Sequence, residues 1–208
     1  MTTDKILGVV LAGGTSRRFG VDKRGALLAG RSVLEWVIER ARPQVETLLL
    51  NTIDDLTAAG RPNIERIADH APGEGPLAGI LAGLDEADHR GFSHMVSFAC
   101  DTPFFPDDTV SHLVASLKAS VADYAVASCG ARAHRIFALW PTGSRKQVEH
   151  AFANGTRSMR DIEHWLETTW ADFPKGGGPD GDPFFNINTP ADLEIAEQWL
   201  VAQSAAAK

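Results

Sequence analysis

Residues 8–23, GVVLAGGTSRRFGVDK, place paired glycines and clustered cations directly after an apolar run. Glycine has no Cβ to keep a ligand away from the backbone, and arginine and lysine side chains bind phosphate oxygens. The cations around the single acid Asp22 are Arg17, Arg18, Lys23 and Arg24. The whole chain carries a net charge of −7, so it does not attract nucleic acid or anionic lipid broadly. The segment therefore predicts a site for a small, phosphate-bearing ligand.

The two most familiar phosphate-binding loops do not fit this segment. A dinucleotide fingerprint, G-x-G-x-x-G, starting at Gly13 would need glycine where Thr15 and Arg18 stand. A P-loop starting at Gly14 would need glycine at Phe19, and no Gly-Lys pair follows. The pattern that remains is L-A-G-G-x-x-x-R-x-G-x-x-K, which begins at Leu11.

Three polar side chains follow other predicted strands. Asn51 and Asp69 each end a strand, and Asp101 follows a buried apolar run. In open α/β sheets, ligands bind beyond the carboxyl ends of the strands, so we expect these side chains near the glycine loop. A carboxylate at that edge suits Mg²⁺, which takes one or two carboxylates together with substrate phosphates. Capping for Asp101 and an exposed loop for Asp69 are the simpler alternatives.

The elements that must position these residues alternate between strands and helices. Strands are expected at 6–11, 46–51, 63–69, 94–101, 123–129, 134–140 and 168–173. Helices are expected at 32–41, 75–87, from Pro106, at 144–153, at 158–166 and from Pro190; Ser32 with Glu35 forms a capping box, and Thr189 is an N-cap. This alternation predicts a three-layer α/β/α fold with a mostly parallel, doubly wound sheet.

Composition limits the class of protein. The chain has 208 residues, 44% hydrophobic and 23% charged, as expected for one globular domain spanning 1–208. Cys100 and Cys129 lack metal-ligand or disulfide spacing, and Cys100 is expected to be a small buried side chain rather than a nucleophile. No stretch approaches the roughly 18 apolar residues of a membrane span. We expect a cytoplasmic protein.

The glycine–cation motif resembles the signature of nucleotidyltransferases with a nucleoside-diphosphate-sugar-transferase-like fold. Three further stretches, EGPLAG (74–79), CDTPF (100–104) and NINTPADL (186–193), stand in the order and spacing of molybdenum cofactor guanylyltransferases. The resemblance covers residues from about 6 to 200. A Rossmann-like sheet of the nucleotide-diphospho-sugar transferase type is the fold that this resemblance implies.

The resemblance also implies a reaction and its site. GMP would pass from GTP to the terminal phosphate of molybdopterin, with Mg²⁺, or Mn²⁺ in its place, held by Asp101. The catalytic residues would be Asp101, Lys23 and Arg18. The nucleotide-binding residues would be Leu11, Ala12, Gly13, Gly14, Lys23, Asn51, Asp69, Gly79 and Asp101. Asn186 and Asn188 would face the acceptor; residues 6–105 would bind the nucleotide and residues 106–200 the acceptor.

Some alternatives stay open at this stage. A CTP-dependent cytidylyltransferase of the same fold is one, although LAGG rather than LAAG favours GTP by resemblance. A non-catalytic nucleotide-binding protein is the other. Arg135 stands where the family commonly has proline after the position of His134, which leaves the acceptor contacts there open. The glycine-rich loop 175–182 is either a flap over the acceptor or a loose connection, and the connection is favoured.

The expected partners follow from the same resemblance. GTP and molybdopterin are the substrates, and molybdenum-cofactor biosynthesis proteins or apo-molybdoenzyme chaperones are candidate protein partners. A monomer is expected, with no nucleic acid and no membrane among its partners.

Overall fold

The computed structural model describes residues 4–13, 26–52, 64–69, 71 and 73–206 of the chain. Gly14, Arg18 and Lys23 lie outside these residues, so the cationic part of the first loop remains a prediction from the sequence. The described residues include no helix that is both long and apolar enough to cross a membrane.

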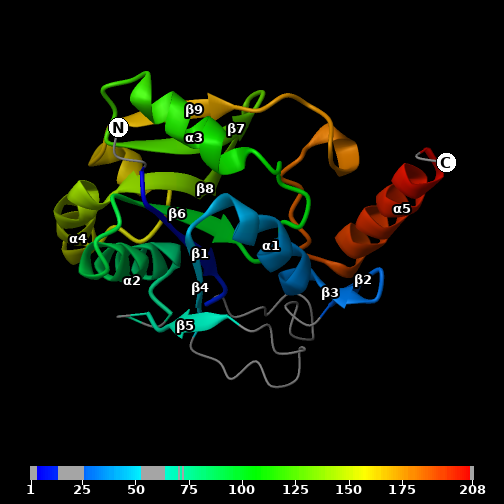
Figure 1. Cartoon of the computed structure of the whole chain (residues 1–208), viewed down its shortest axis with the longest axis horizontal. Coiled ribbons are helices and arrows are strands. Elements are labelled where there is room, and N and C mark those ends of the chain that lie inside the picture. Colours follow the sequence, from blue (N-terminus) through cyan, green and yellow to red (C-terminus); the bar gives the residue numbers. More distant parts are fainter. Residues whose placement is uncertain (1–3, 14–25, 53–63, 70, 72, 207–208) are drawn as a thin grey trace.

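A seven-stranded mixed sheet forms the centre of the described structure (Figure 1). Its order is β5-β4-β1-β6-β8-β7-β9, and β8 alone runs antiparallel to both of its neighbours. The strands are β1 (Ile6–Leu11), β4 (Thr47–Asn51), β5 (Glu65–Ile67), β6 (His94–Ala99), β7 (Tyr124–Cys129), β8 (Arg132–Pro141) and β9 (Thr168–Asp172). The predicted mostly parallel sheet is confirmed.

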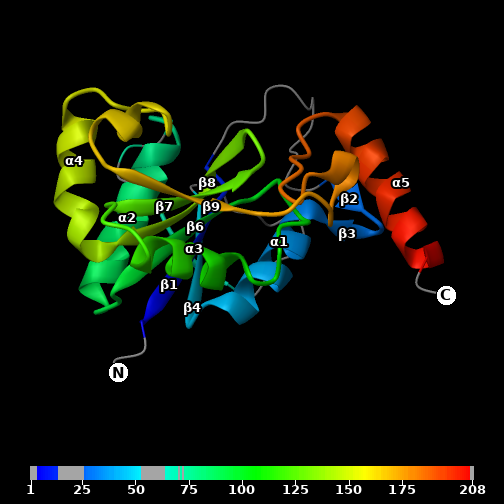
Figure 2. The ribbon, with the colours of Figure 1, turned by 90° about the horizontal axis from the view of Figure 1, so that it is seen from above.

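Helices cover both faces of this sheet. On one face α1 (Val33–Ala41) and α3 (Thr109–Lys118) pack against inward-facing side chains such as Val10 and Phe98. On the other face α2 (Pro76–His89) and α4 (Arg145–Ala153) pack against Leu7, Val9 and Met95. Alternate residues of β1 thus enter opposite cores, which is why its sequence is apolar throughout. The three-layer α/β/α arrangement is the one expected (Figure 2).

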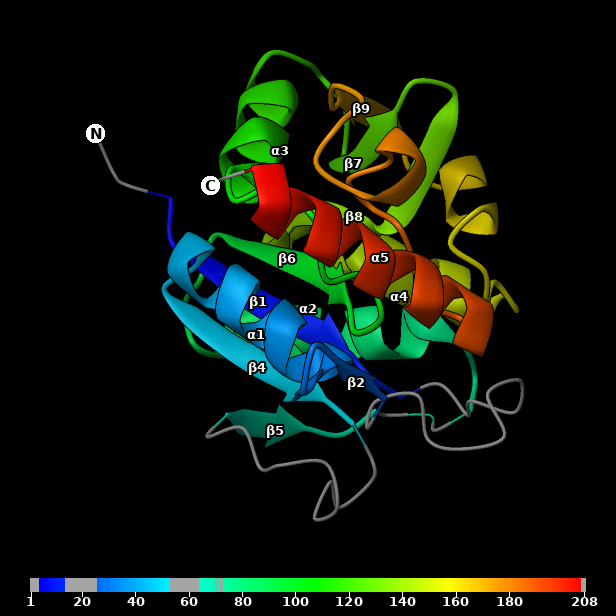
Figure 3. The ribbon, with the colours of Figure 1, turned by 90° about the vertical axis from the view of Figure 1, so that its right-hand side faces the viewer.

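The last helix, α5 (Pro190–Ala206), lies outside these layers (Figure 3). It packs on a third apolar cluster, where Phe104 meets Trp199 with ring centroids 4.7 Å apart and Ile187 is buried. A short hairpin, β2 (Leu27–Leu28) and β3 (Arg31–Ser32), completes this cluster through Leu28. The hairpin could not be predicted from the sequence, because each strand has two residues, too few to show an alternating pattern.

Two helix predictions need correction. Residues 158–166 do not form a helix along their length; only a 3-10 helix, Asp161–His164, occurs there. The helix expected from Pro106 begins at Thr109. Three further 3-10 turns are Arg42–Gln44, Thr142–Ser144 and Pro179–Gly181. The Ser32–Glu35 capping box is present as predicted.

The sheet order places a topological switch point beside β1. From β1 the chain moves outward through β4 to β5, and then returns to place β6 on the opposite side of β1. Leu11 pairs in register with both Asn51 and Ala99, so three strands end at the same level. Such a reversal leaves a crevice at the carboxyl ends of the strands, where ligands bind.

Candidate active site

The first side of the site forms where β1, β4 and the segment after β5 end. Asn51 is the last residue of β4 and is buried, and its Nδ2 donates to Oδ1 of Asp69 at 2.6 Å. The backbone N–H of Ala12 donates to the carbonyl oxygen of Asn51 at 2.9 Å. The two polar residues predicted from strand ends are therefore bonded to each other and to the start of the first loop.

Two glycines allow this cluster to close. A Cβ on Gly79 would stand 2.5 Å from Oδ1 of Asn51 and 3.0 Å from Cδ2 of Leu11. A Cβ on Gly13 would stand 3.1 Å from Oδ2 of Asp69. Six of the residues predicted to bind the nucleotide therefore lie together: Leu11, Ala12, Gly13, Asn51, Asp69 and Gly79. Glycine is needed at position 79 because Asn51 lies too close for a Cβ, and not because of the backbone conformation there.

Helix α2 begins at this cluster. Pro76 is its first residue, and the helix runs for 14 residues with no side-chain cap at Gly75. The first N–H groups of a helix have no intrahelical partner and favour anions. The EGPLAG stretch therefore combines the helix entry expected from its sequence with backbone donors beside Asn51 and Gly13.

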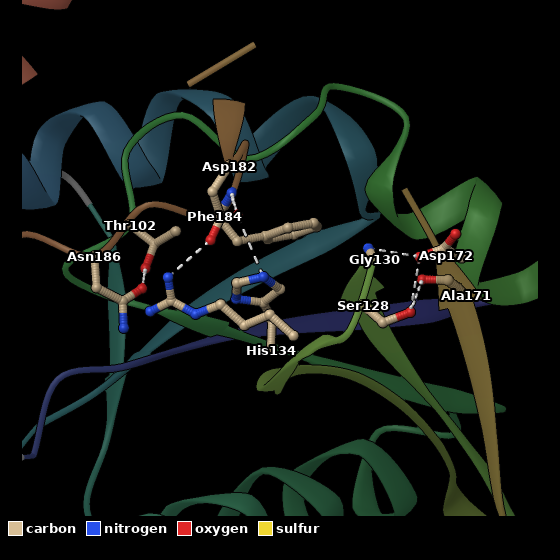
Figure 4. A network of polar contacts seen from close by, with 10 residues as sticks. Thr102, Ser128, Gly130, His134, Ala171, Asp172, Asp182, Phe184 and Asn186 are labelled. Atoms are coloured by element: carbon tan, nitrogen blue, oxygen red, sulfur yellow. Dashed lines mark hydrogen bonds and ion pairs between the residues drawn. The ribbon is translucent and has the colours of Figure 1, made fainter. Parts of the chain in front are cut away.

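The second side of the site forms where β6 ends. Asp101 stands two residues beyond β6 and is half-buried, and Thr102 after it is fully buried. The Thr102 hydroxyl donates to Oδ1 of Asn186 at 2.5 Å (Figure 4). The N–H of Ile187 donates to the carbonyl oxygen of Asp101 at 2.8 Å. The segments CDTPF and NINTPADL, far apart in the sequence, therefore lie side by side.

The two predicted acceptor asparagines differ in their surroundings. Asn186 is half-buried and faces Thr102, whereas Asn188 is exposed. The backbone N–H groups of Asn188 and Thr189 donate to Oδ2 of Asp192 at 2.9 and 2.8 Å, and Asp192 N–H donates back to the Thr189 hydroxyl. The backbone around Asn188 thus belongs to the cap of α5, as predicted for Thr189, while Asn186 lies against the segment that carries Asp101.

Asp101 fits a magnesium ion shared with a phosphate ligand. Its carboxylate supplies hard oxygen donors at the switch-point edge, and Mg²⁺ prefers oxygen and retains several waters or phosphate oxygens. Within the part of the chain that the structure describes, no three His, Cys, Asp or Glu side chains are grouped to hold a metal. A single carboxylate suits a metal whose other ligands are water and substrate oxygens.

The two cysteines differ in their surroundings. Neither forms a disulfide. Cys129 is buried, and burial raises the pKa of its thiol, with the Asp182 and Asp172 carboxylates raising it further. Cys100 packs against the main core and is partly buried, where the sequence predicted a small buried side chain.

His134 and Arg135 point to different partners. His134 is buried, its ring stacks on Phe184 at 4.6 Å between centroids, and its Nε2 lies 3.2 Å from Oδ1 of Asp182. Burial lowers the pKa of His134 more than the Asp182 carboxylate raises it, so the ring is neutral near pH 7. Arg135 donates instead to Glu163 at 2.6 Å. The departure from the family at Arg135 therefore does not involve the residues beside Asn186.

The glycine-rich loop 175–182 is not a loose connection. The N–H of Gly176 donates to the carbonyl oxygen of Gly181 at 2.8 Å, and Asp182 N–H donates to that of Pro179 at 3.0 Å. Thr102 and Asp182 could not be singled out from the sequence. The importance of both residues comes from contacts with distant segments, which no local pattern reports.

Comparison with known proteins identifies the family. Residues 8–169 match the MobA-like NTP transferase domain. A molybdenum cofactor guanylyltransferase of Bradyrhizobium sp. (strain ORS 278) is 39% identical over 207 residues, covering 95% of this chain and 94% of that protein. One of Rhizobium meliloti (strain 1021) is 40% identical over 199 residues, covering 92% and 90%.

Solved structures agree on the fold. Molybdopterin-guanine dinucleotide biosynthesis protein A from Archaeoglobus fulgidus superposes with a TM-score of 0.74 at 28% identity, covering 94% of this chain and 99% of that one. CMP:2-keto-3-deoxy-manno-octonic acid synthetase complexed with CTP has a TM-score of 0.67 at 12% identity, covering 96% and 98%, and so supports the fold alone. The fold is of the nucleotide-diphospho-sugar transferase type. The chain belongs to the MobA-like NTP transferases and, among them, to the molybdenum cofactor guanylyltransferase family.

Proposed function

We propose that this chain transfers GMP from GTP to the terminal phosphate of molybdopterin, forming molybdopterin guanine dinucleotide and pyrophosphate. Family membership supports the reaction. The observation that carries the residue assignment is the contact of the Asp101–Thr102 segment with Asn186, next to the Asn51–Asp69 cluster. A transferase needs two substrates held at one point, and this edge of the sheet offers two adjoining sets of polar groups.

The Asn51–Asp69 cluster is proposed to bind the nucleoside of GTP. Asn51 occupies Oδ1 of Asp69, which leaves Oδ2 on the side of Gly13. A carboxylate oxygen there can accept hydrogen bonds from the donor groups on the guanine edge. The backbone of Leu11, Ala12 and Gly13 would lie against the nucleotide, while Gly14, Arg18 and Lys23, outside the described residues, would neutralise the phosphates.

The Asn186 side is proposed to bind the acceptor. Asn186 accepts from Thr102 through Oδ1, so its Nδ2 retains two donor hydrogens for a phosphate or pterin oxygen. Asn188, two residues further on, is exposed and is assigned to the same substrate. In this division residues 6–105 bind the nucleotide and residues 106–200 the acceptor.

The proposed reaction needs no covalent enzyme intermediate. An acceptor phosphate oxygen attacks the α-phosphorus of GTP, its new P–O bond forms, and the bond between the α-phosphorus and the bridging oxygen breaks to release pyrophosphate. The attacking oxygen is already anionic, so no general base is required. When bound, Mg²⁺ supplies positive charge that offsets the negative charge growing on the phosphate oxygens. The residues of this chain position both substrates and exclude competing geometries.

Asp101 would hold the metal in this scheme. We further propose that Mn²⁺ can replace Mg²⁺, that the chain acts as a monomer, and that it works in the cytoplasm. Molybdenum-cofactor biosynthesis proteins or apo-molybdoenzyme chaperones are the proposed recipients or donors of its substrates.

Pyrophosphate release tests the proposed function directly. The chain is incubated with Mg²⁺ and each of GTP, CTP, ATP and UTP, with and without molybdopterin. We expect release with GTP and molybdopterin together, and little with either alone. Release with CTP in preference to GTP would establish the cytidylyltransferase alternative, and GTP binding without any release would establish a non-catalytic nucleotide-binding protein.

Replacing Asp101 by alanine is expected to lower turnover at least about 10²-fold, because it removes the proposed metal ligand. Asp108→Ala is the matched control: it removes an exposed carboxylate that makes no side-chain cap bond at the start of α3. Turnover is measured at saturating GTP and molybdopterin. Near-normal turnover of a folded Asp101→Ala variant contradicts the metal assignment.

Gly79→Ala tests the nucleotide pocket. Its new methyl group would meet Oδ1 of Asn51 at 2.5 Å and displace the Asn51–Asp69 pair, so GTP affinity is expected to fall about tenfold or more, ~1.4 kcal/mol per tenfold. Gly83→Ala is the control, because the atoms nearest to its Cβ would be those of Val9 and Met95, one turn further along α2. Titration calorimetry with GTP measures both. Equal affinities for the two variants would remove Asn51 and Gly79 from the pocket.

A further inference from the structure

Asp182 gathers hydrogen bonds from two separate parts of the chain (Figure 4). Its Oδ1 accepts from the backbone N–H of Phe184 at 2.9 Å and lies 3.2 Å from Nε2 of His134. Its Oδ2 accepts from Arg132 at 3.0 Å. Strand β8 supplies Arg132 and His134, so this one carboxylate links the start of β8 to the segment that leads to Asn186.

The bond between His134 and Asp182 is incompletely formed. The two atoms lie 3.2 Å apart, yet Nε2 is buried and makes no hydrogen bond of good geometry. The His134 side chain is 5% exposed and that of Asp182 14%. The neutral His134 ring lies beside the Asp182 carboxylate, which has little access to water. A small movement of the ring would therefore make Asp182 its hydrogen-bond acceptor.

Three residues after Asp182 are held by contacts with other parts of the chain. Phe184 is fully buried and packs against His134, Phe137 and Phe173. Asn186 accepts from Thr102, and Ile187 donates to Asp101. The backbone N–H of Phe185 donates to the carbonyl oxygen of Asp182 at 3.2 Å, so residues 182–185 form a turn, and a displacement at Asp182 would pass through this turn to the proposed acceptor-binding side chain.

The preceding loop permits this geometry. A Cβ on Gly178 would stand 2.1 Å from the carbonyl oxygen of Asp182, so only glycine allows the loop to fold back against it. Residues 175–182 thus close on themselves and end with the Asp182 carboxylate turned toward β8. The loop forms a fixed base for the segment that follows, rather than a flap.

We propose that Asp182, held by His134 and Arg132, is a positioning residue that fixes Asn186 against the Asp101–Thr102 segment and so sets the affinity for the acceptor. The inference about the acceptor rests on the proposed function. The inference about position does not, because it concerns contacts within this chain.

Two variants weaken the contacts of Asp182 with β8 in different ways. Asp182→Asn keeps the size of the side chain but removes the charge that Arg132 and His134 face. His134→Phe keeps a ring against Phe184 and removes the N–H donor. His134→Gln is the conservative replacement, because its amide N–H can reach Asp182. Asp172→Asn is the matched control. Asp172 is also a carboxylate at a strand end, but it accepts from the Gly130 N–H and the Ser128 hydroxyl, which lie outside residues 182–187.

The first measurement is steady-state kinetics. For Asp182→Asn and His134→Phe we expect the KM for molybdopterin to rise about tenfold, with the KM for GTP and kcat within about twofold of wild type. His134→Gln should recover most of the affinity, and Asp172→Asn should match wild type. An equal fall in activity toward both substrates, or no recovery in His134→Gln, would indicate a merely structural role and overturn the assignment.

The second measurement needs no substrate. Hydrogen exchange is followed at the Ile187 amide, which donates to Asp101, and at amides of α2 as an internal reference. We expect exchange at Ile187 to speed up about tenfold in Asp182→Asn and His134→Phe, and to stay at the wild-type rate in Asp172→Asn. Unchanged exchange at Ile187 in both variants overturns the inference even if the chain proves to be an active guanylyltransferase. Faster exchange in a chain that forms no pyrophosphate keeps the positioning role and rejects the proposed function.

Discussion

The hydrogen bond from Thr102 to Asn186, reinforced by that from Ile187 to Asp101, is the constraint on which the rest of the site depends. It joins residues 84 positions apart in the sequence. Thr102 has no exposed surface, so its hydroxyl must find a partner inside the protein, and Asn186 supplies it. Once this bond forms, the carboxylate proposed to hold the metal and the amide proposed to bind the acceptor cannot drift apart.

The strand order of the sheet allows the segments that carry Asp101 and Asn186 to come together. Parallel β1, β4 and β6 end at one level and present Asn51 and Asp101 on the two sides of β1. The antiparallel β8 then brings His134 from the opposite direction, so its side chain meets a segment that returns after β9. A purely parallel sheet would have offered only strand ends at this edge. The mixed order instead allows the second half of the chain to close the site from the side.

Much of this arrangement could be predicted from the sequence. Continuous apolar runs marked the buried strands, and an alternating segment marked the strand before Asp69. Asn51, Asp69 and Asp101 could be placed at one edge because each ends or follows a predicted strand. The capping motifs at Ser32 and Thr189 fixed two helix starts, since those signals depend only on near neighbours. Features that depend only on neighbouring residues could therefore be predicted from the sequence.

The rest could not be predicted, because it depends on distant contacts. Gly79 was assigned by resemblance, but its reason, the closeness of Asn51, appears only once α2 lies beside β4. Asp182 looked like part of a glycine-rich connection, and its partners stand some 50 residues earlier. The helix expected at 158–166 was reduced to a 3-10 turn. The β2–β3 hairpin was too short to leave a pattern.

The most direct test of the account follows the α-phosphorus itself. The chain is supplied with molybdopterin and GTP labelled with ³²P at either the α or the γ phosphate, and the products are separated. The account predicts that α label appears in molybdopterin guanine dinucleotide and γ label in pyrophosphate, in equal amounts. Label from the γ position in orthophosphate, or α label remaining in GTP and GMP alone, would contradict it.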